Sequence, residues 1–414
     1  MSAPRPVVVE VDDDPIRWHG PTGGDYLSRW FASASQRSRL DLLWCTDDGL
    51  SQHYRVQRDA SFSDGSPVRA SDHARAIRTA LTVPSLQRFL IDIRAVHTSK
   101  DTLVIEVRRP APHLSGLLQS VDLAPVSPCG HLSSGAYERA VRTCDDAYWL
   151  EPVSAGTPPV QVLVRRDPHG APERFLRGEV DVTCATAFPL DRVPDFADSG
   201  AFHTAPTGIE MCLEVVPGSR SAVGDPEFRR RLLGALRYDR LVARCWNGVE
   251  SAAPDHHVEA PPSTAGTGER LRLGYWDYYP NLDVAEEVAA QLTENLGVEV
   301  ELAPADFVSG SAHSFDLLLA LRGPLFEDPI GALDLLDPAR RDPVLAPLLR
   351  RLSEDPDDEE AADELRRAAR EQCPVLPLLR LRGHWLQREA LAGRPWPPMD
   401  AVRFPRFSWT ADSP

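Results

Sequence analysis

A strand, a helix and a second strand follow one another between residues 271 and 302. Leu271–Tyr275 and Val298–Leu302 are apolar runs of strand length, and residues 281–296 have apolar side chains at helical spacing. Gly297 is a typical residue for ending that helix. A helix that joins two strands packs on the sheet that they form. The chain is therefore predicted to be an α/β protein.

Length and charge narrow the class further. The chain has 414 residues, of which 42% are hydrophobic, and it is too long for one ordinary domain. Its formal net charge of −16 gives an acidic surface that repels phosphate backbones, so no direct nucleic-acid partner is expected. No stretch approaches the roughly 18 apolar residues of a membrane span, so no membrane insertion is expected.

The cysteines and the first residues predict a cytoplasmic protein. The seven cysteines are odd in number and include no Cys-x-x-Cys pair, so we expect neither a disulfide framework nor a structural zinc site. Scattered single cysteines suit a reducing cytosol. The apolar run Val7–Val9 is shorter than the apolar region of a secretory signal, and no signal peptide or lipobox cysteine is seen near Met1.

The sequence contains no motif of a familiar catalytic or cofactor site. It has no P-loop, Gly-x-Gly-x-x-Gly, Gly-x-Ser-x-Gly or His-Glu-x-x-His. Asp255–His257 lies in a Pro-rich segment without a visible third ligand, which favours exposed histidines over a metal site. The neighbours of Cys184 favour an inert core thiol over a nucleophile. We therefore predict no catalytic residue, no metal and no cofactor, and we favour binding over catalysis.

The segment Phe62–Asp72 reads as a tight turn followed by the start of a helix. Asp64-Gly65 permits the reversal, because glycine tolerates a positive φ. Pro67 fixes the backbone just after it, and Ser71 or Asp72 can cap the helix that follows.

This string resembles the F-S-D-G-x-P signature of the family 5 solute-binding proteins, the peptide- and nickel-binding receptors of ABC importers. Four further segments resemble motifs of that family in the right order: Asp101–Pro112, Ser134–Tyr137, Arg174–Asp181 and Asp225–Leu241. The resemblance spans about residues 40–405 of the chain.

The resemblance implies a bilobal periplasmic-binding-protein-like fold (type II, cluster C) with a hinge and an extra small subdomain. The implied division is lobe I from residues 1–45, 125–240 and 380–414, the small subdomain from 46–124, and lobe II from 241–379. The hinge strands are expected near Glu210–Val216 and Val375–Arg380.

One segment departs from the peptide-binding members of the family, which carry W-x-x-D-Y-x-x-P and pair the Asp with the free amine of the ligand. Alignment on Pro329 puts Leu325 at the carboxylate position and Arg322 at the tryptophan position. A buried ammonium would then lack its partner, so a free peptide amine is disfavoured. Two interpretations of Arg322 stay open: it meets a ligand carboxylate or phosphate, or it pairs with Glu327 or Asp328.

Ligands of bilobal α/β proteins sit beyond the carboxyl ends of strands, between the lobes. Trp276 and Tyr278 directly follow the strand 271–275, although an ordinary apolar patch is an equal alternative for them. Seven side chains are predicted to contact the ligand: Arg17, Trp18, Thr186, Glu214, Trp276, Tyr278 and Arg322.

The sequence thus predicts a cytoplasmic ligand-binding protein that closes two lobes on a small organic molecule, anionic or peptide-like. A transporter or a regulator is the expected partner. Two alternatives stay open: the fold reused as an enzyme of specialised metabolism, which a closing and water-excluding site would suit, and an importer receptor with a misassigned start.

Overall fold

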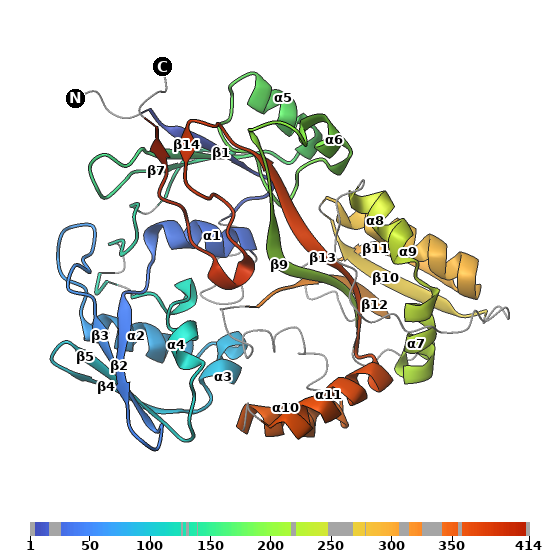
Figure 1. Cartoon of the computed structure of the whole chain (residues 1–414), viewed down its shortest axis with the longest axis horizontal. Coiled ribbons are helices and arrows are strands. Elements are labelled where there is room, and N and C mark those ends of the chain that lie inside the picture. Colours follow the sequence, from blue (N-terminus) through green and yellow to red (C-terminus); the bar gives the residue numbers. More distant parts are fainter. Residues whose placement is uncertain are drawn as a thin grey trace.

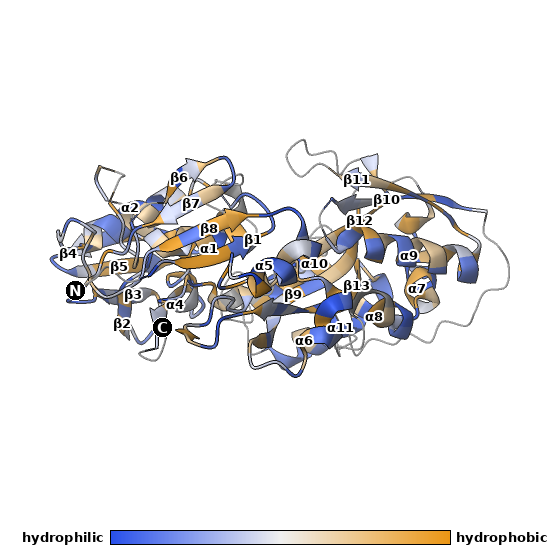
Figure 2. Cartoon of the chain, turned by 90° about the horizontal axis from the view of Figure 1, so that it is seen from above, coloured by the Kyte–Doolittle hydropathy of each residue, from blue (hydrophilic) through white to orange (hydrophobic). Residues whose placement is uncertain are grey.

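The computed structural model describes residues 5–15, 26–125, 127–129, 132–138, 140–216, 221–246, 268–277, 279–305, 314–324, 342–354 and 358–410. These residues form a mixed α/β structure with several sheets, as the sequence predicts. Two bodies lie on either side of a pair of long strands, and Figure 2 shows them end to end. Within the described residues, no helix is both long and apolar enough to cross a membrane.

Lobe I is built on a sheet with the strand order β1-β8-β7-β6. Its strands are β1 (Val7–Val11), β6 (Val141–Cys144), β7 (Ala147–Leu150) and β8 (Val160–Val164). β1 runs parallel to β8, and the helix α1 (Tyr26–Ser35) packs its apolar side chains into the same core. The short strands β14 (Leu391–Ala392) and β15 (Ser408–Trp409) pair near the chain ends.

The small subdomain is a second sheet, with the order β2-β3-β5-β4. Its elements are β2 (Leu40–Cys45), β3 (Ser51–Val56), α2 (Ala70–Ala80), α3 (Pro84–Leu90), β4 (Ile93–Ser99), β5 (Thr102–Val107) and α4 (Leu114–Leu117). The predicted division starts this subdomain at residue 46, whereas β2 already belongs to its sheet, because β2 forms a hairpin with β3.

The turn and helix of the segment Phe62–Asp72 form as predicted, with one difference at the helix start. Gly65 has a φ of +81°, and the backbone N–H of Ser66 donates to Asp64 Oδ1 at 2.9 Å. The helix α2 begins earlier than the predicted cap. Asp72 lies inside its first turn, where its carboxylate accepts from the backbone N–H of Arg69 at 2.9 Å.

Lobe II is built on a sheet with the order β11-β10-β12-β9-β13. The predicted strand–helix–strand unit is β10 (Arg270–Trp276), α9 (Asn281–Leu296) and β11 (Glu299–Ala305), and its two strands are parallel. β12 (Leu317–Arg322) lies on the other side of β10. Gly297 ends α9 with a φ of +65°, as predicted.

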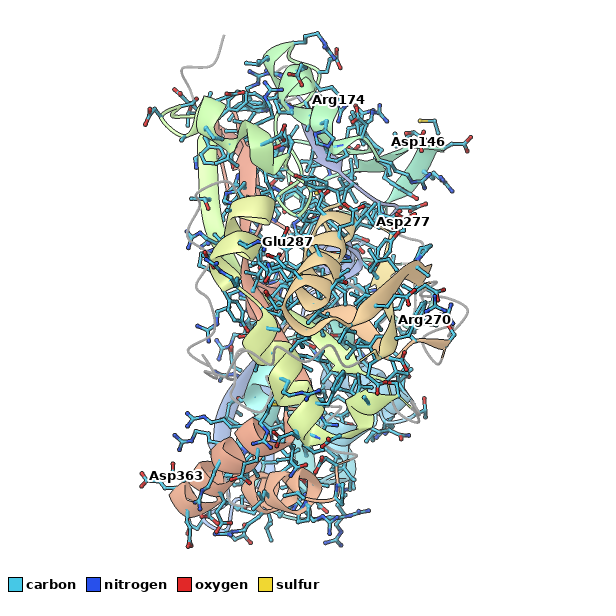
Figure 3. The ribbon with its side chains drawn as sticks, turned by 90° about the vertical axis from the view of Figure 1, so that its right-hand side faces the viewer. Asp146, Arg174, Arg270, Asp277, Glu287 and Asp363 are labelled. Atoms are coloured by element: carbon cyan, nitrogen blue, oxygen red, sulfur yellow. The ribbon has the colours of Figure 1, made fainter. Side chains whose placement is uncertain are left out.

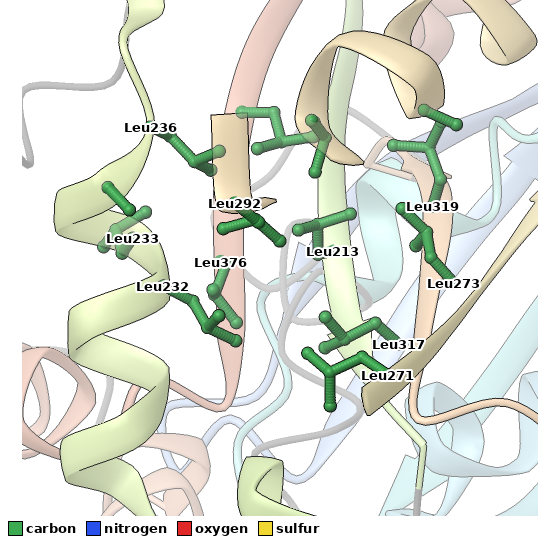
Figure 4. Close-up of a cluster of buried hydrophobic side chains, with 14 of the residues drawn as sticks. Leu213, Leu232, Leu233, Leu236, Leu271, Leu273, Leu292, Leu317, Leu319 and Leu376 are labelled. Carbon is green, nitrogen blue, oxygen red and sulfur yellow. The ribbon is translucent and has the colours of Figure 1, made fainter. Parts of the chain in front are cut away.

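One face of this sheet is covered by helices. α7 (Pro226–Ala235), α8 (Tyr238–Trp246) and α9 share an apolar core with it, and Figure 4 shows the leucines of that core. The predicted division gives residues 226–240 to lobe I, whereas α7 packs on lobe II through Phe228 and Leu232. The helical pattern of α7 is visible in the sequence, but the sheet that covers its apolar side is not.

The long strands β9 (Phe202–Val215) and β13 (Val375–Leu386) join the two lobes (Figure 1). They pair antiparallel from Glu214–Val375 in lobe II to Phe202–Leu386 in lobe I, with two register shifts on the way. β9 starts earlier than the predicted hinge segment Glu210–Val216 and ends at Val215, one residue before its end, and β13 includes the predicted segment Val375–Arg380 and extends beyond it.

The remaining helices cover the outside. They are α5 (Ala171–Leu176), α6 (Val193–Phe196), α10 (Leu345–Glu354) and α11 (Glu359–Gln372). The turn after α5 has the glycine that the sequence predicts, Gly178, with a φ of +77°. A 3₁₀ helix, Leu190–Arg192, precedes α6.

Candidate functional site

Strand β9 carries two glutamates on one face where it enters lobe II. Successive side chains of a strand point to opposite faces, so Glu210, Cys212 and Glu214 share one face. Met211 and Leu213 point to the other face and are buried in the core under α7, α8 and α9. The glutamates therefore lie on the face of the sheet that those helices do not cover.

Arg322, at the end of β12, pairs with Glu214. Its Nη2 donates to Glu214 Oε2 at 2.8 Å and its Nε donates to Glu214 Oε1, so the planar guanidinium holds both carboxylate oxygens. The side chain of Glu214 is 11% exposed and that of Arg322 is 32% exposed. Two of the predicted ligand residues thus meet, and their role with a ligand stays a prediction. The alternative partners Glu327 and Asp328 lie outside the described residues.

A second ion pair lies beside the first one. In the strand register, Arg322 stands opposite Glu210, and Glu214 stands opposite Leu318. Glu210 is instead paired with Arg380 of β13, whose Nε lies 3.2 Å from Glu210 Oε1. Three neighbouring strands therefore carry two acids and two bases in a small area. An ion pair as exposed as Glu210–Arg380 contributes only about 0–1 kcal/mol to stability.

Trp276 ends β10 on the same face of the sheet. Trp276 comes directly after Tyr275, which pairs with Leu319 of β12, so Trp276 lies near the end of β12. Its ring is half-buried and packs against a small apolar cluster of Val216, Ala305, Phe315 and Leu318. Trp276 and the Glu214–Arg322 pair therefore belong to one surface. Figure 3 labels the next residue, Asp277, on the side of lobe II that is nearer to Arg174 of lobe I.

Thr186 belongs to lobe I, at the carboxyl end of β1. Its Oγ1 lies 3.2 Å from Cys184 Sγ, and that thiol donates to Asp12 Oδ1 at 3.4 Å. Burial, together with the Asp12 charge, raises the pKa of the Cys184 thiol well above its usual range. The thiol is therefore neutral at physiological pH, as the prediction of an inert core cysteine requires.

Two glycines allow close contacts near the junction of the lobes. A Cβ on Gly323, next to Arg322, would lie 2.6 Å from Met399 Sδ of lobe I and 3.1 Å from Gly208 O of β9. A Cβ on Gly383 of β13 would lie 3.1 Å from the Cβ of Ala185, the neighbour of Thr186. The backbones approach this closely only because these positions lack side chains.

Three predicted ligand residues, Arg17, Trp18 and Tyr278, lie outside the described residues. Sequence reasoning did not select Glu210 and Arg380. The spacing of Glu210 and Glu214 in a strand was the available signal, because residues four apart in a strand share a face.

The described residues contain no group of three or more His, Cys, Asp or Glu side chains placed to hold a metal ion. A shallow hollow lies elsewhere, on the outer side of α2, lined by Ser71, Arg75, Arg78, Thr79 and Thr82. None of the predicted ligand residues lines it.

No family model matches the chain, and no curated protein matches its sequence. Solved structures match over nearly the full length. The murein tripeptide binding protein MppA of Escherichia coli has a TM-score of 0.81 at 18% identity, with 97% of each chain covered. OppA of Haemophilus influenzae, complexed with the peptide RPPGFSPFR, has a TM-score of 0.82 at 14% identity, with 98% of this chain and 99% of that chain covered.

A third structure, MppA in an unliganded open form, has a TM-score of only 0.64 at 18% identity, with 97% of this chain and 96% of that chain covered. MppA thus matches this chain less well in its open form than in the first structure, where the TM-score is 0.81. The mixed sheets, the long joining strands and the full-length match confirm what the motifs predicted: this chain has the bilobal fold of the family 5 solute-binding proteins.

Proposed function

We propose that this protein binds a small organic ligand that carries a carboxylate, and that it closes lobes I and II around that ligand. Arg322 is the predicted contact for the carboxylate, and Trp276 offers an aromatic surface on the same face of the sheet. The long strands β9 and β13 serve as the hinge, because they are the strands that run from one lobe into the other.

The Glu214–Arg322 pair is the single observation that carries this proposal. A guanidinium that already holds a carboxylate through two parallel hydrogen bonds has the geometry that a ligand carboxylate needs. Glu214 then competes with the ligand for Arg322. The proposed ligand is therefore an anion, in keeping with the loss of the carboxylate at Leu325 that would meet a free amine.

The similar structures support ligand binding. MppA is a murein tripeptide binding protein, and OppA is complexed with the peptide RPPGFSPFR. Both share this fold at low identity, which supports ligand binding between lobes without fixing the ligand. A peptide-like molecule with a blocked amine and a free carboxylate would satisfy both the fold and the charges.

The test compares two matched ligand pools by isothermal calorimetry and thermal shift. One pool holds N-acetylated tripeptides and tetrapeptides as free acids, and the other holds the same peptides as carboxamides. The acid pool should bind and raise the melting temperature, and the amide pool should not. Native mass spectrometry of protein purified from its own host should show a retained molecule with a carboxylate.

Two variants make the test specific to the site. Arg322→Ala should abolish the difference between the pools. Glu214→Gln should tighten binding of the acids by about tenfold, because the charged Glu214 no longer competes with the ligand for Arg322. A hydrogen bond to a charged group contributes roughly 1.5–3 kcal/mol, and the low end of that range corresponds to the tenfold change. Equal binding of both pools, or acid binding that survives Arg322→Ala, would contradict the proposal. Turnover of a bound molecule would instead support the enzyme alternative.

We also propose that the protein acts in the cytoplasm with a transporter or a regulator as its partner. The support is chemical: Cys45 and Cys144 are exposed to solvent as thiols and not in disulfides, a state that a reducing compartment preserves. In intact cells, a membrane-permeant maleimide should label these thiols and an impermeant maleimide should not. Labelling by both reagents would place the protein outside.

A further inference from the structure

Tyr279 makes a contact between the two lobes at a place separate from the ion pairs. The backbone N–H of Leu190 donates to the Tyr279 hydroxyl at 3.0 Å. Tyr279 lies between β10 and α9 of lobe II, whereas Leu190 begins the 3₁₀ helix before α6. The bond therefore joins segments that are 89 positions apart in the chain.

The segment around Leu190 is anchored in lobe I. Its neighbours Phe188 and Val193 are buried in a cluster with Phe175 and Leu386, under the sheet of β1 and β8. Leu190 itself is only partly buried, and its side chain packs against the apolar core of lobe II. Lobe I thus extends one apolar side chain and one backbone donor to lobe II at this point, and Figure 1 shows α6 near α8 there.

The ring of Tyr279 is held on a second side by lobe I. His169, next to α5, meets it edge to face with ring centroids 5.4 Å apart and an angle of 72° between the planes. The His169 Nδ1 lies 3.9 Å from Asp191 Oδ1. Aromatic pairs of this kind prefer such tilted arrangements. The tyrosine therefore meets lobe I through both its hydroxyl and its ring.

These contacts exist in a structure that matches the OppA–peptide complex with a TM-score of 0.82 and the unliganded open form of MppA with a TM-score of only 0.64. A contact present in one lobe arrangement and lost in another shifts the balance between them by its own free energy. We propose that Tyr279 is a positioning residue that holds the lobes together through Leu190 and His169. It sets how long a ligand is retained without contacting that ligand, and this rests on the proposed lobe closure.

The first experiment needs no ligand. In ligand-free protein, Tyr279→Phe keeps the ring and removes the hydroxyl that accepts from Leu190. Hydrogen exchange of the Leu190 amide should then become roughly fivefold faster, the change expected from losing one hydrogen bond. Small-angle scattering should show a larger radius of gyration. Tyr148→Phe is the matched control, because its hydroxyl donates to Asp14 within lobe I at 2.6 Å.

The second experiment measures dissociation of the N-acetylated peptide acids. Tyr279→Phe should release them roughly fivefold faster, with a smaller effect for His169→Ala, and the melting temperature should change no more than in Tyr148→Phe. Unchanged Leu190 exchange and an unchanged radius of gyration in Tyr279→Phe would overturn the inference, as would the same changes in Tyr148→Phe. If the peptides bind to none of the variants, that result would count against the proposed function. The role of Tyr279 would then be tested by the ligand-free experiment alone.

Discussion

Replacing His73 should change how the stability of this protein depends on pH. His73 lies on the buried side of α2 with no solvent exposure, and neither of its ring nitrogens has a hydrogen-bond partner within the described residues. Burial lowers the pKa of His73 to about 4, because the charged imidazolium cannot be solvated there. The folded protein therefore needs this histidine neutral.

The sign and size of the change in folding stability with pH follow from the pKa values of His73 in the folded and unfolded chain. In the unfolded chain His73 takes up a proton near pH 6.5, whereas in the folded chain it does so only near pH 4. The unfolded state binds more protons between these values, so the contribution is intact above pH 6.5 and is lost as the pH falls. At about 1.36 kcal/mol per pH unit, the loss is roughly 2 kcal/mol at pH 5 and roughly 3 kcal/mol below pH 4.

The assay is urea unfolding at pH 8 and pH 5 for the wild type, His73→Leu and His73→Gln. Both variants should lose roughly 2 kcal/mol less than the wild type between the two pH values. The glutamine variant cannot titrate but keeps a buried polar group, so it separates titration from packing. His384 remains in every protein and contributes equally, since burial lowers its pKa to about 4 as well. Parallel stability–pH curves for the three proteins would refute the reasoning.

Three further substitutions test the fold. Asp181→Ala should cost roughly 2–3 kcal/mol in urea unfolding, because its buried carboxylate accepts from the backbone N–H of Val8 at 2.9 Å; a cost below about 0.5 kcal/mol would contradict this role. Gly297→Ala should lower thermal stability by roughly 1 kcal/mol, since its φ of +65° strains any residue with a Cβ; calorimetry would reveal it. Leu292→Ala should cost roughly 2–5 kcal/mol by opening a cavity in the core of lobe II, a loss that chemical denaturation should detect.

Local signals in the sequence were sufficient for much of the fold. Helix α9 has the predicted bounds, since its apolar spacing and Gly297 are both local signals. The turn at Gly65 and the glycine after α5 also depend on a few neighbouring residues only. The family motifs supplied the arrangement of the lobes, which no local pattern contains.

The extent of β9 could not be predicted in the same way. The predicted hinge segment starts at Glu210, whereas the strand starts at Phe202. Pro206 and Gly208 are residues that usually interrupt a strand, so the sequence gives no reason to extend the strand back past them. The structure accommodates both residues: Pro206 pairs with Arg382 of β13, and Gly208 has a φ of +70° beside Met399. The partner strand that tolerates them is about 170 residues away in the chain, so the sequence around β9 gives no sign of it.

The pairing of Glu214 with Arg322 in the candidate site could not be predicted from the sequence either. Glu214 and Arg322 could each be selected from their place near a strand end, but their pairing depends on β9 and β12 being neighbours in antiparallel register. In that register Arg322 faces Glu210, yet Glu210 is paired with Arg380, so Arg322 turns to the less exposed Glu214. When a ligand carboxylate binds Arg322, the largely buried carboxylate of Glu214 loses this partner. Ligands that also offer a donor to Glu214 should therefore bind more tightly than simple anions.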